Sequence, residues 1–269
     1  MGRLFAVVVT IIALVSAAIF ALRIWWLPPD ISTHGGAIDR QLNETMVTAG
    51  ILFVAAQLAL AAFVWRFEAR AGAPARPIKT FPGGVTPMVV IATVLVGIEA
   101  LALTLVGSKV WAQVYQSPPA SGAMQVEVLA EQFAYYFRYA GPDGRFGAIH
   151  AEKMSDADQN FFGLDPANDT TARDDIVVAT LVIPINRPIA LRMYAKDVSH
   201  SFYVPELRIQ QDFVPGMVIP LHFTATAPGK YELVCTQLCG LGHYNMRAYI
   251  EVKTPADFDQ WLKQQAPAL

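Results

Sequence analysis

Long apolar runs dominate the first 108 residues and are absent from the rest of the chain. Residues 4–22 and 45–65 are uncharged and mostly apolar, and Glu99 is the only charged residue between positions 80 and 108. A helix of about 20 such residues spans the roughly 30 Å hydrocarbon core of a bilayer. We therefore predict a membrane region over residues 1–110, with helices at about 4–26, 45–66 and 86–108.

Basic residues between the second and third runs predict the orientation of these helices. This loop has one acidic residue, Glu68, against four basic residues: Arg66, Arg70, Arg76 and Lys79. Cytoplasmic loops carry such an excess, so the chain after Lys109 should lie outside. The first run follows Met-Gly-Arg, which suits a signal peptide or a retained anchor. The lack of a clear small-x-small cleavage site and the Trp25-Trp26 pair at the membrane interface favour a retained helix.

After residue 109 the pattern changes to short β-rich segments separated by Pro and Gly. Strands are predicted at residues 124–130, 132–139, 176–183, 189–195, 217–226, 231–235 and 247–252. Several short strands of this kind indicate an all-β Greek-key sandwich or barrel over residues 111–269. The polar, acidic region 148–175 is expected to be a long surface loop. Thr254-Pro255 begins a capped C-terminal helix.

The segment from Val234 to Met246 carries the clearest chemistry. It reads V-C-T-Q-L-C-G-L-G-H-Y-N-M and contains both cysteines of the protein, followed by His243. Thiolate, imidazole and thioether are soft donors, which favour copper over magnesium, calcium or manganese. The sequence therefore predicts a copper site on this loop.

The donor types alone leave four interpretations of the cysteine pair open. A disulfide fits an oxidising compartment but leaves His243 and Met246 unexplained. A zinc site seldom uses Met, and the spacings are not those of a zinc finger. A single blue copper needs one Cys, two His and an axial Met, which leaves one thiol unused. Two thiolates bridging two copper ions, each capped by a histidine, use every donor.

The binuclear interpretation needs a second histidine from elsewhere in the chain. His200 lies in D-V-S-H-S-F-Y-V-P, where an apolar strand pattern gives way to a turn. His222 falls within a strand-like run, where a histidine is expected to be packed or solvated on a sheet face. His34 and His150 lie in polar loops without a pattern. We therefore expect His200 to be the second imidazole.

Two segments closely resemble subunit II of the haem-copper cytochrome c oxidases. They are D-V-S-H-S-F-Y-V-P-E-L at 197–207 and C-T-Q-L-C-G-L-G-H-Y-N-M at 235–246, supported by W-W-L-P-P-D near residue 25, G-P-D-G-R-F-G at 141–147 and D-F-V-P-G at 212–216. The resemblance implies a cupredoxin-like Greek-key barrel and a binuclear copper centre, CuA. The implied copper ligands are His200, Cys235, the backbone carbonyl of Gln237, Cys239, His243 and Met246.

The resemblance also implies a role in respiration. The subunit is expected to accept electrons from cytochrome c or another small periplasmic donor and to pass them to haem in subunit I. There oxygen is reduced to water and protons are pumped. The expected surroundings are subunit I, subunit III and the lipid of a bacterial plasma membrane, with the copper domain in the periplasm.

Four positions depart from the family pattern. Phe133 and Tyr135 stand where the family has tryptophans that receive electrons from cytochrome c. Gln237 replaces a glutamate thought to help bind magnesium at the subunit I interface, and a neutral amide is a poorer ligand for that cation, so magnesium is not predicted. Met88 stands where a proton-path glutamate is usual. Glu99 lies about 16 Å further along the helix and is either a displaced proton-path residue or an acid satisfied by subunit I.

Charge and the lack of other motifs bear on partners. The region from Lys109 onward has 17 acidic and 13 basic residues. Such a surface can steer a basic cytochrome c, although acidic loops are often simply solvated. Nothing in the sequence suggests nucleic-acid binding. The alternatives are the CuA subunit of a nitric oxide reductase and a non-enzymatic module for copper storage or delivery.

Overall fold

The computed structural model describes residues 1–68 and 85–269. Arg70, Arg76 and Lys79 of the predicted cytoplasmic loop lie outside these residues. The chain divides into two compact units. The helical unit comprises Met1–Leu27 and Ala37–Val110, and the β unit comprises Pro28–Gly36 and Trp111–Leu269.

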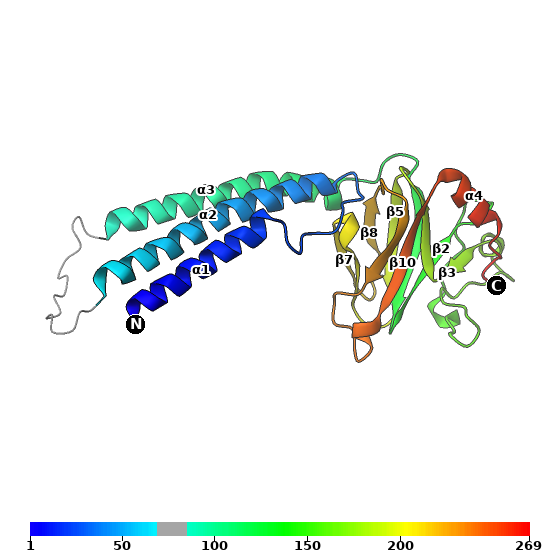
Figure 1. Cartoon of the computed structure of the whole chain (residues 1–269). Coiled ribbons are helices and arrows are strands. Elements are labelled where there is room, and N and C mark those ends of the chain that lie inside the picture. The colour runs from blue at the N-terminus through cyan, green and yellow to red at the C-terminus, as the bar shows by residue number, and fades with distance from the viewer. Residues whose placement is uncertain (69–84) are drawn as a thin grey trace. The chain divides into compact units, whose positions relative to one another are not determined.

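Three long helices form the helical unit: α1 (Gly2–Ala21), α2 (Gly35–Phe67) and α3 (Thr86–Trp111). They lie side by side in Figure 1. All three are long and apolar enough to cross a membrane, as the hydropathy pattern predicts. Most of their large apolar side chains are exposed, which is the arrangement expected of helices that face lipid.

The helix ends differ from those predicted by hydropathy. Helix α1 ends at Ala21, before the Trp pair, because Arg23 and Trp25 adopt left-handed backbone conformations with φ of 54° and 55°. Helix α2 begins at Gly35, before the apolar run, and includes the polar residue Glu44. Hydropathy marks the part of a helix that suits hydrocarbon, whereas backbone hydrogen bonding continues into the flanking polar residues.

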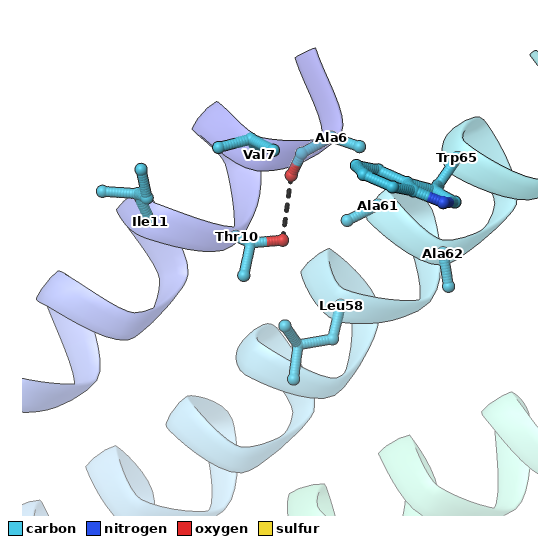
Figure 2. Close-up of a pocket in the computed structure, with 8 residues that line it drawn as sticks. All are labelled: Ala6, Val7, Thr10, Ile11, Leu58, Ala61, Ala62 and Trp65. Atoms are coloured by element: carbon cyan, nitrogen blue, oxygen red, sulfur yellow. Dashed lines mark hydrogen bonds between the residues drawn. The ribbon is translucent and has the colours of Figure 1, made fainter. Parts of the chain in front are cut away.

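Helices α1 and α2 approach each other through small residues (Figure 2). Ala6 of α1 and Ala61 of α2 are 3% and 6% exposed. The hydroxyl of Thr10 donates a hydrogen bond of 2.9 Å to the Ala6 carbonyl, so this polar side chain is satisfied within its own helix. Small side chains let the helix backbones come close, which is how membrane helices commonly pack.

The β unit consists of two five-stranded sheets. One has the order β3-β2-β1-β5-β8 and the other the order β4-β10-β9-β6-β7. The strands are β1 (Met124–Glu131), β2 (Ala134–Tyr139), β3 (Ile176–Val178), β4 (Thr180–Pro184), β5 (Ile189–Ala195), β6 (His200–Val204), β7 (Ile209–Phe213), β8 (Ile219–Phe223), β9 (Gly229–Val234) and β10 (Arg247–Lys253). A π-helical turn, η1 (Ala112–Gln116), precedes them, and helix α4 (Pro255–Lys263) follows.

Strand pairing in both sheets is out of chain order. Strand β1 pairs antiparallel with β2 and parallel with β5, and β10 pairs antiparallel with β9 and parallel with β4. Along β10 alternate residues are buried, so one face of the strand lines the core. The predicted all-β, two-sheet architecture is therefore confirmed.

Two strands were missing from the prediction. Strand β6, which begins at His200, falls in the stretch interpreted as a turn, and no strand was predicted at β7. Only a short 3-10 turn, with Arg208 in a left-handed conformation at its end, separates them. The predicted single strand at 176–183 is also wrong in detail. It divides into β3 and β4, which belong to different sheets. Short strands broken by Pro or by a change of sheet leave little periodicity to detect.

The loop over residues 148–175 contains two 3-10 turns, η2 (Ala151–Lys153) and η3 (Thr170–Ala172). It has a small core of its own, in which Phe162 and Leu164 pack with Leu129 of β1. The rings of Tyr136 and Phe161 stack with centroids 3.6 Å apart. The expected surface loop is therefore anchored to the first sheet by buried apolar side chains.

A buried ionic cluster also holds this region in place. The Arg138 guanidinium is fully buried and lies 2.9 Å from Glu127 Oε2 and 2.6 Å from Asp175 Oδ2. It also donates to the Gly147 carbonyl. Burial raises the pKa of the Glu127 and Asp175 carboxyls, and the Arg138 cation opposes that shift. The cluster joins β1 and β2 to the end of the long loop.

The segment Pro28–Gly36, which connects α1 to α2, belongs to the β unit. The Ile31 N–H donates 2.9 Å to the Glu206 carbonyl, and Ile31 accepts 2.7 Å from the Thr226 N–H. Ser32 and Ala225 form an isolated antiparallel bridge. A connection between two helices thus adds a short extended piece beside the end of β8.

Candidate metal centre

Four elements bring the predicted donors together. His200 is the first residue of β6, Cys235 directly follows β9, and Met246 directly precedes β10. The Cys235 N–H donates 3.2 Å to the Met246 carbonyl and closes the loop between β9 and β10. His243 begins the 3-10 turn η5 (His243–Asn245) within that loop. Strands β6 and β9 are neighbours in one sheet, which places His200 beside the loop.

The two cysteines are free thiols. Their sulfurs are 3.9 Å apart, well beyond the roughly 2.05 Å of a disulfide bond. Cys235 and Cys239 therefore do not form a disulfide bond in the structure. Ligand atoms of His200, Cys235 and Cys239 lie within 4.8 Å of one another, a group that could hold a metal ion.

The other predicted ligands lie around this group. The separations are 3.2 Å from His200 Nδ1 to Met246 Sδ, 3.7 Å from Cys239 Sγ to Met246 Sδ, 3.6 Å from Cys239 Sγ to His243 Nδ1 and 3.1 Å from Cys235 Sγ to the Gln237 carbonyl. His200 is fully buried, and Cys235, Cys239 and Met246 are at most 8% exposed. The structure brings all six predicted donors into one place, and their soft character suits copper.

The thiols differ in acidity. Burial opposes ionisation of Cys235, but hydrogen bonds with His200 and the Ser201 backbone outweigh it and lower the pKa of this thiol. The pKa of the Cys239 thiol is raised, because burial and the neighbouring Cys235 sulfur both disfavour a second negative charge. A bound cation would relieve this repulsion, since the thiolate is the form that binds metals.

Asp197 and Gln132 support the donors, and sequence reasoning missed both. Asp197 Oδ1 lies 2.8 Å from His200 Nε2, which leaves the other ring nitrogen directed at the sulfurs. Gln132 donates from its backbone to Asp197 at 2.8 Å and from its side chain to the Cys239 carbonyl at 2.6 Å. The position of Asp197, three residues before His200, was a usable signal. Gln132 gave none.

The two aromatic candidates occupy different environments. Phe133 is 39% exposed, and its ring lies directly against the loop from Cys235 to Met246: a Cβ at Gly242 would stand 2.5 Å from the ring. Tyr135 is buried, and its hydroxyl donates 2.7 Å to the Ser201 carbonyl. Phe133 is therefore at the surface beside the donors, whereas Tyr135 lies beneath them.

Glu99 belongs to the helical unit, whereas the predicted donors belong to the β unit. It lines a cavity of about 200 Å³ between α2 and α3 together with Gln41, Glu44 and Thr48. Met88, at the position where the family has glutamate, is 56% exposed. The acid on α3 thus faces polar side chains of α2 within its own unit.

Comparison with known proteins assigns the family. The profile of the family described as "Cytochrome C oxidase subunit II, periplasmic domain" matches residues 156–253. "Alternative cytochrome c oxidase subunit 2" of Bradyrhizobium diazoefficiens is 33% identical over 262 residues, which cover 97% of this chain and 91% of that protein. The chain belongs to the cytochrome c oxidase subunit II family. As such it is subunit II of an oxidase complex, with a role in electron transfer in a terminal oxidase and subunit I as its partner.

Two further matches have lower sequence identity. "Cytochrome c oxidase subunit 2" of Cereibacter sphaeroides is 28% identical over 259 residues, covering 93% of this chain and 78% of that protein. The solved periplasmic domain of subunit II (CoxB) of Bradyrhizobium japonicum aligns with a TM-score of 0.39 and 24% identity, over 54% of this chain and 94% of that one. The profile match and the three apolar helices indicate a membrane protein with N-terminal spans and a periplasmic domain.

Proposed function

We propose that this subunit II holds a binuclear copper centre. The proposed ligands are His200, Cys235, the Gln237 carbonyl, Cys239, His243 and Met246. The observation that carries the proposal is the pair of free, buried thiols 3.9 Å apart, with imidazole and thioether donors around them. Held by Cys235 and Cys239, such a pair of copper ions would accept and release one electron at a time with small changes in bond length.

The chain's own residues keep this site rigid and dry. Burial of His200, Cys239 and Met246 excludes water from the donors. Asp197 fixes the orientation of the His200 ring, in the way that outer-shell carboxylates commonly orient metal-bound histidines. Donors on strand ends and on a loop closed by backbone hydrogen bonds move little, which suits repeated electron transfer.

We further propose the path of electrons. Phe133 is an exposed aromatic side chain against the loop from Cys235 to Met246, and it is the proposed contact for cytochrome c or another small periplasmic donor. Tyr135 is buried in the protein behind Phe133. Electrons then pass to haem in subunit I, where oxygen is reduced to water and protons are pumped. The complex would lie in a bacterial plasma membrane and include subunit III.

Glu99 is the proposed proton-carrying group of the helical unit. A carboxyl group within a membrane helix is costly unless it faces polar groups or a path for protons. The cavity that Glu99 shares with Glu44 and Thr48 supplies such groups. Loss of proton pumping in Glu99→Gln, with copper content unchanged, would support this role, and normal pumping would contradict it.

The proposed copper centre is tested by electron paramagnetic resonance on the full chain loaded with copper. We expect two copper ions per chain and an unpaired spin shared equally by both nuclei. A spectrum from a single isolated copper would overturn the binuclear assignment. Retention of the copper against a chelator separates a fixed redox centre from a storage module. Measuring whether the purified complex consumes oxygen or nitric oxide distinguishes a terminal oxidase from a nitric oxide reductase.

Replacing Phe133 tests the proposed donor contact. Phe133→Ala is expected to slow reduction of the copper-loaded protein by reduced cytochrome c while leaving its copper spectrum unchanged. Phe133→Trp should retain the rate, because it keeps an aromatic surface over the loop. Tyr136→Phe, which preserves the stack on Phe161, is the matched control. Stopped-flow reduction measures all three, and an unchanged rate in Phe133→Ala would rule this contact out.

A further inference from the structure

A second group of imidazoles lies within the β unit, apart from the copper donors. A cavity of about 230 Å³ is lined by residues that include Thr33, His34, Gln113, Pro188, His222 and Thr224. None of the six proposed copper ligands lines it. Its walls come from the segment before α2, from η1, and from β5 and β8 of the first sheet.

His34 presents a bare ring nitrogen in this region. The residue is 7% exposed, and its Nε2 is buried without a hydrogen-bond partner. Burial lowers the pKa of His34, so the ring is neutral near pH 7, and a hydrogen bond to the Leu207 backbone opposes that shift. Because a carbonyl oxygen only accepts, that bond requires the proton on Nδ1. Nε2 therefore carries a free lone pair.

His222 is held in a comparable way. Its Nε2 lies 2.8 Å from the Ser117 carbonyl, so Nε2 carries the proton and Nδ1 carries the lone pair when the ring is neutral. The residue lies on β8 opposite Ala190 of β5, which fixes its backbone. His34 and His222 line the same cavity.

We propose that His34 and His222 together bind a divalent transition-metal ion of the zinc class. Each ring has one nitrogen anchored to a backbone carbonyl and the other available, which is the arrangement found in metal-binding histidines. Neutral imidazole is a preferred ligand of zinc, copper and nickel ions. Gln113 and Thr33 line the same cavity, and their side chains carry oxygen atoms that could complete the coordination.

Such an ion would connect two parts of the chain that are far apart in sequence. His34 lies in the segment that joins α1 to α2, and His222 lies in the first sheet. A ligand that binds only the folded arrangement stabilises it by mass action. The site is thus expected to hold the Pro28–Gly36 segment on the β unit.

The test uses the full chain in detergent after loading with copper, so that the copper donors are already occupied. Zn²⁺ is the probe, bound zinc is measured by elemental analysis after gel filtration, and Co²⁺ absorption reports the type of donor. We expect one additional zinc per chain and a higher melting temperature with zinc. His34→Ala and His222→Ala should each weaken zinc binding by at least about tenfold, since even outer-shell losses cost that much.

His150→Ala is the matched control. This histidine lies on the long loop with a side chain 35% exposed, and its removal should leave zinc binding unchanged. Zinc binding that persists in both cavity variants overturns the proposal. Wild-type protein that binds no more zinc than the His34→Ala/His222→Ala double variant also overturns it, because the cavity then holds water alone. If His34→Ala fails to fold, His222→Ala decides, with the copper spectrum reporting an intact fold.

Discussion

Replacing Cys235 by serine is expected to abolish the shared-spin copper signal and the rapid reduction of the protein by cytochrome c. Cys235 Sγ lies 3.9 Å from Cys239 Sγ and 3.1 Å from the Gln237 carbonyl, at the centre of the donor group. A serine hydroxyl is a harder donor that stays protonated, so it does not bridge two copper ions as a thiolate does. Cys239→Ser should have the same effect.

Leu238→Ala is the matched control for the cysteine variants. Leu238 lies between the two cysteines, is 78% exposed and contributes no donor, so its removal should leave the signal intact. Electron paramagnetic resonance and copper analysis on each variant make the comparison. We expect the serine variants to hold at most one copper, with the spin on a single nucleus. A spin still shared by two nuclei in Cys235→Ser would refute the bridging role.

Replacing Arg138 by methionine is expected to lower the free energy of unfolding at pH 7 by about 3–5 kcal/mol, the usual cost of removing one partner of a buried ion pair. Methionine keeps much of the side-chain volume but removes the cation. Glu127 and Asp175 would then be buried carboxylates without their main partner. Urea unfolding followed by the far-ultraviolet circular dichroism of the β unit measures the change.

The same variant should depend on pH in a defined direction. Burial already raises the pKa of Glu127 and Asp175, and loss of the cation raises both further. The carboxyls of the folded variant then bind protons at a pH where those of the unfolded chain, with pKa values of about 4, are still ionised. Folding of the variant therefore takes up protons, so its loss of unfolding free energy relative to the wild type should be smaller at pH 5 than at pH 7. Arg192→Met is the control. Arg192 lies 3.0 Å from the same Glu127, but its side chain is 50% exposed, so the cost should be below about 1 kcal/mol.

The sequence was informative where a signal is continuous or where donors are close along the chain. Three apolar runs were sufficient to predict three helices, because the spanning length fixes the minimum run. The loop from Cys235 to Met246 contains five of the six proposed ligands. His200 was predicted from its motif, and the structure places its Nδ1 3.2 Å from Met246.

Contacts between residues far apart in the chain could not be predicted from the sequence. Arg138 and Asp175 are 37 positions apart, and Gln132 and Asp197 are 65 positions apart. Neither pair leaves a periodic pattern, because each contact depends on how strands and loops are arranged. Phe133 and Tyr135 illustrate the same limit. Strict alternation along one strand would give both the same face, but β2 begins at Ala134, so Phe133 lies in the preceding turn and its ring packs against Gly242.

The place of Pro28–Gly36 in the β unit has a consequence for biogenesis. Arg208 donates to the Pro28 carbonyl across 180 positions of sequence. During synthesis this short connection is made long before the strands that receive it, so the final closure of the periplasmic domain must wait for the chain near residue 226. A soluble fragment starting at residue 111 leaves the Glu206 carbonyl and the Thr226 N–H without these partners, and grafting the connection back should restore them.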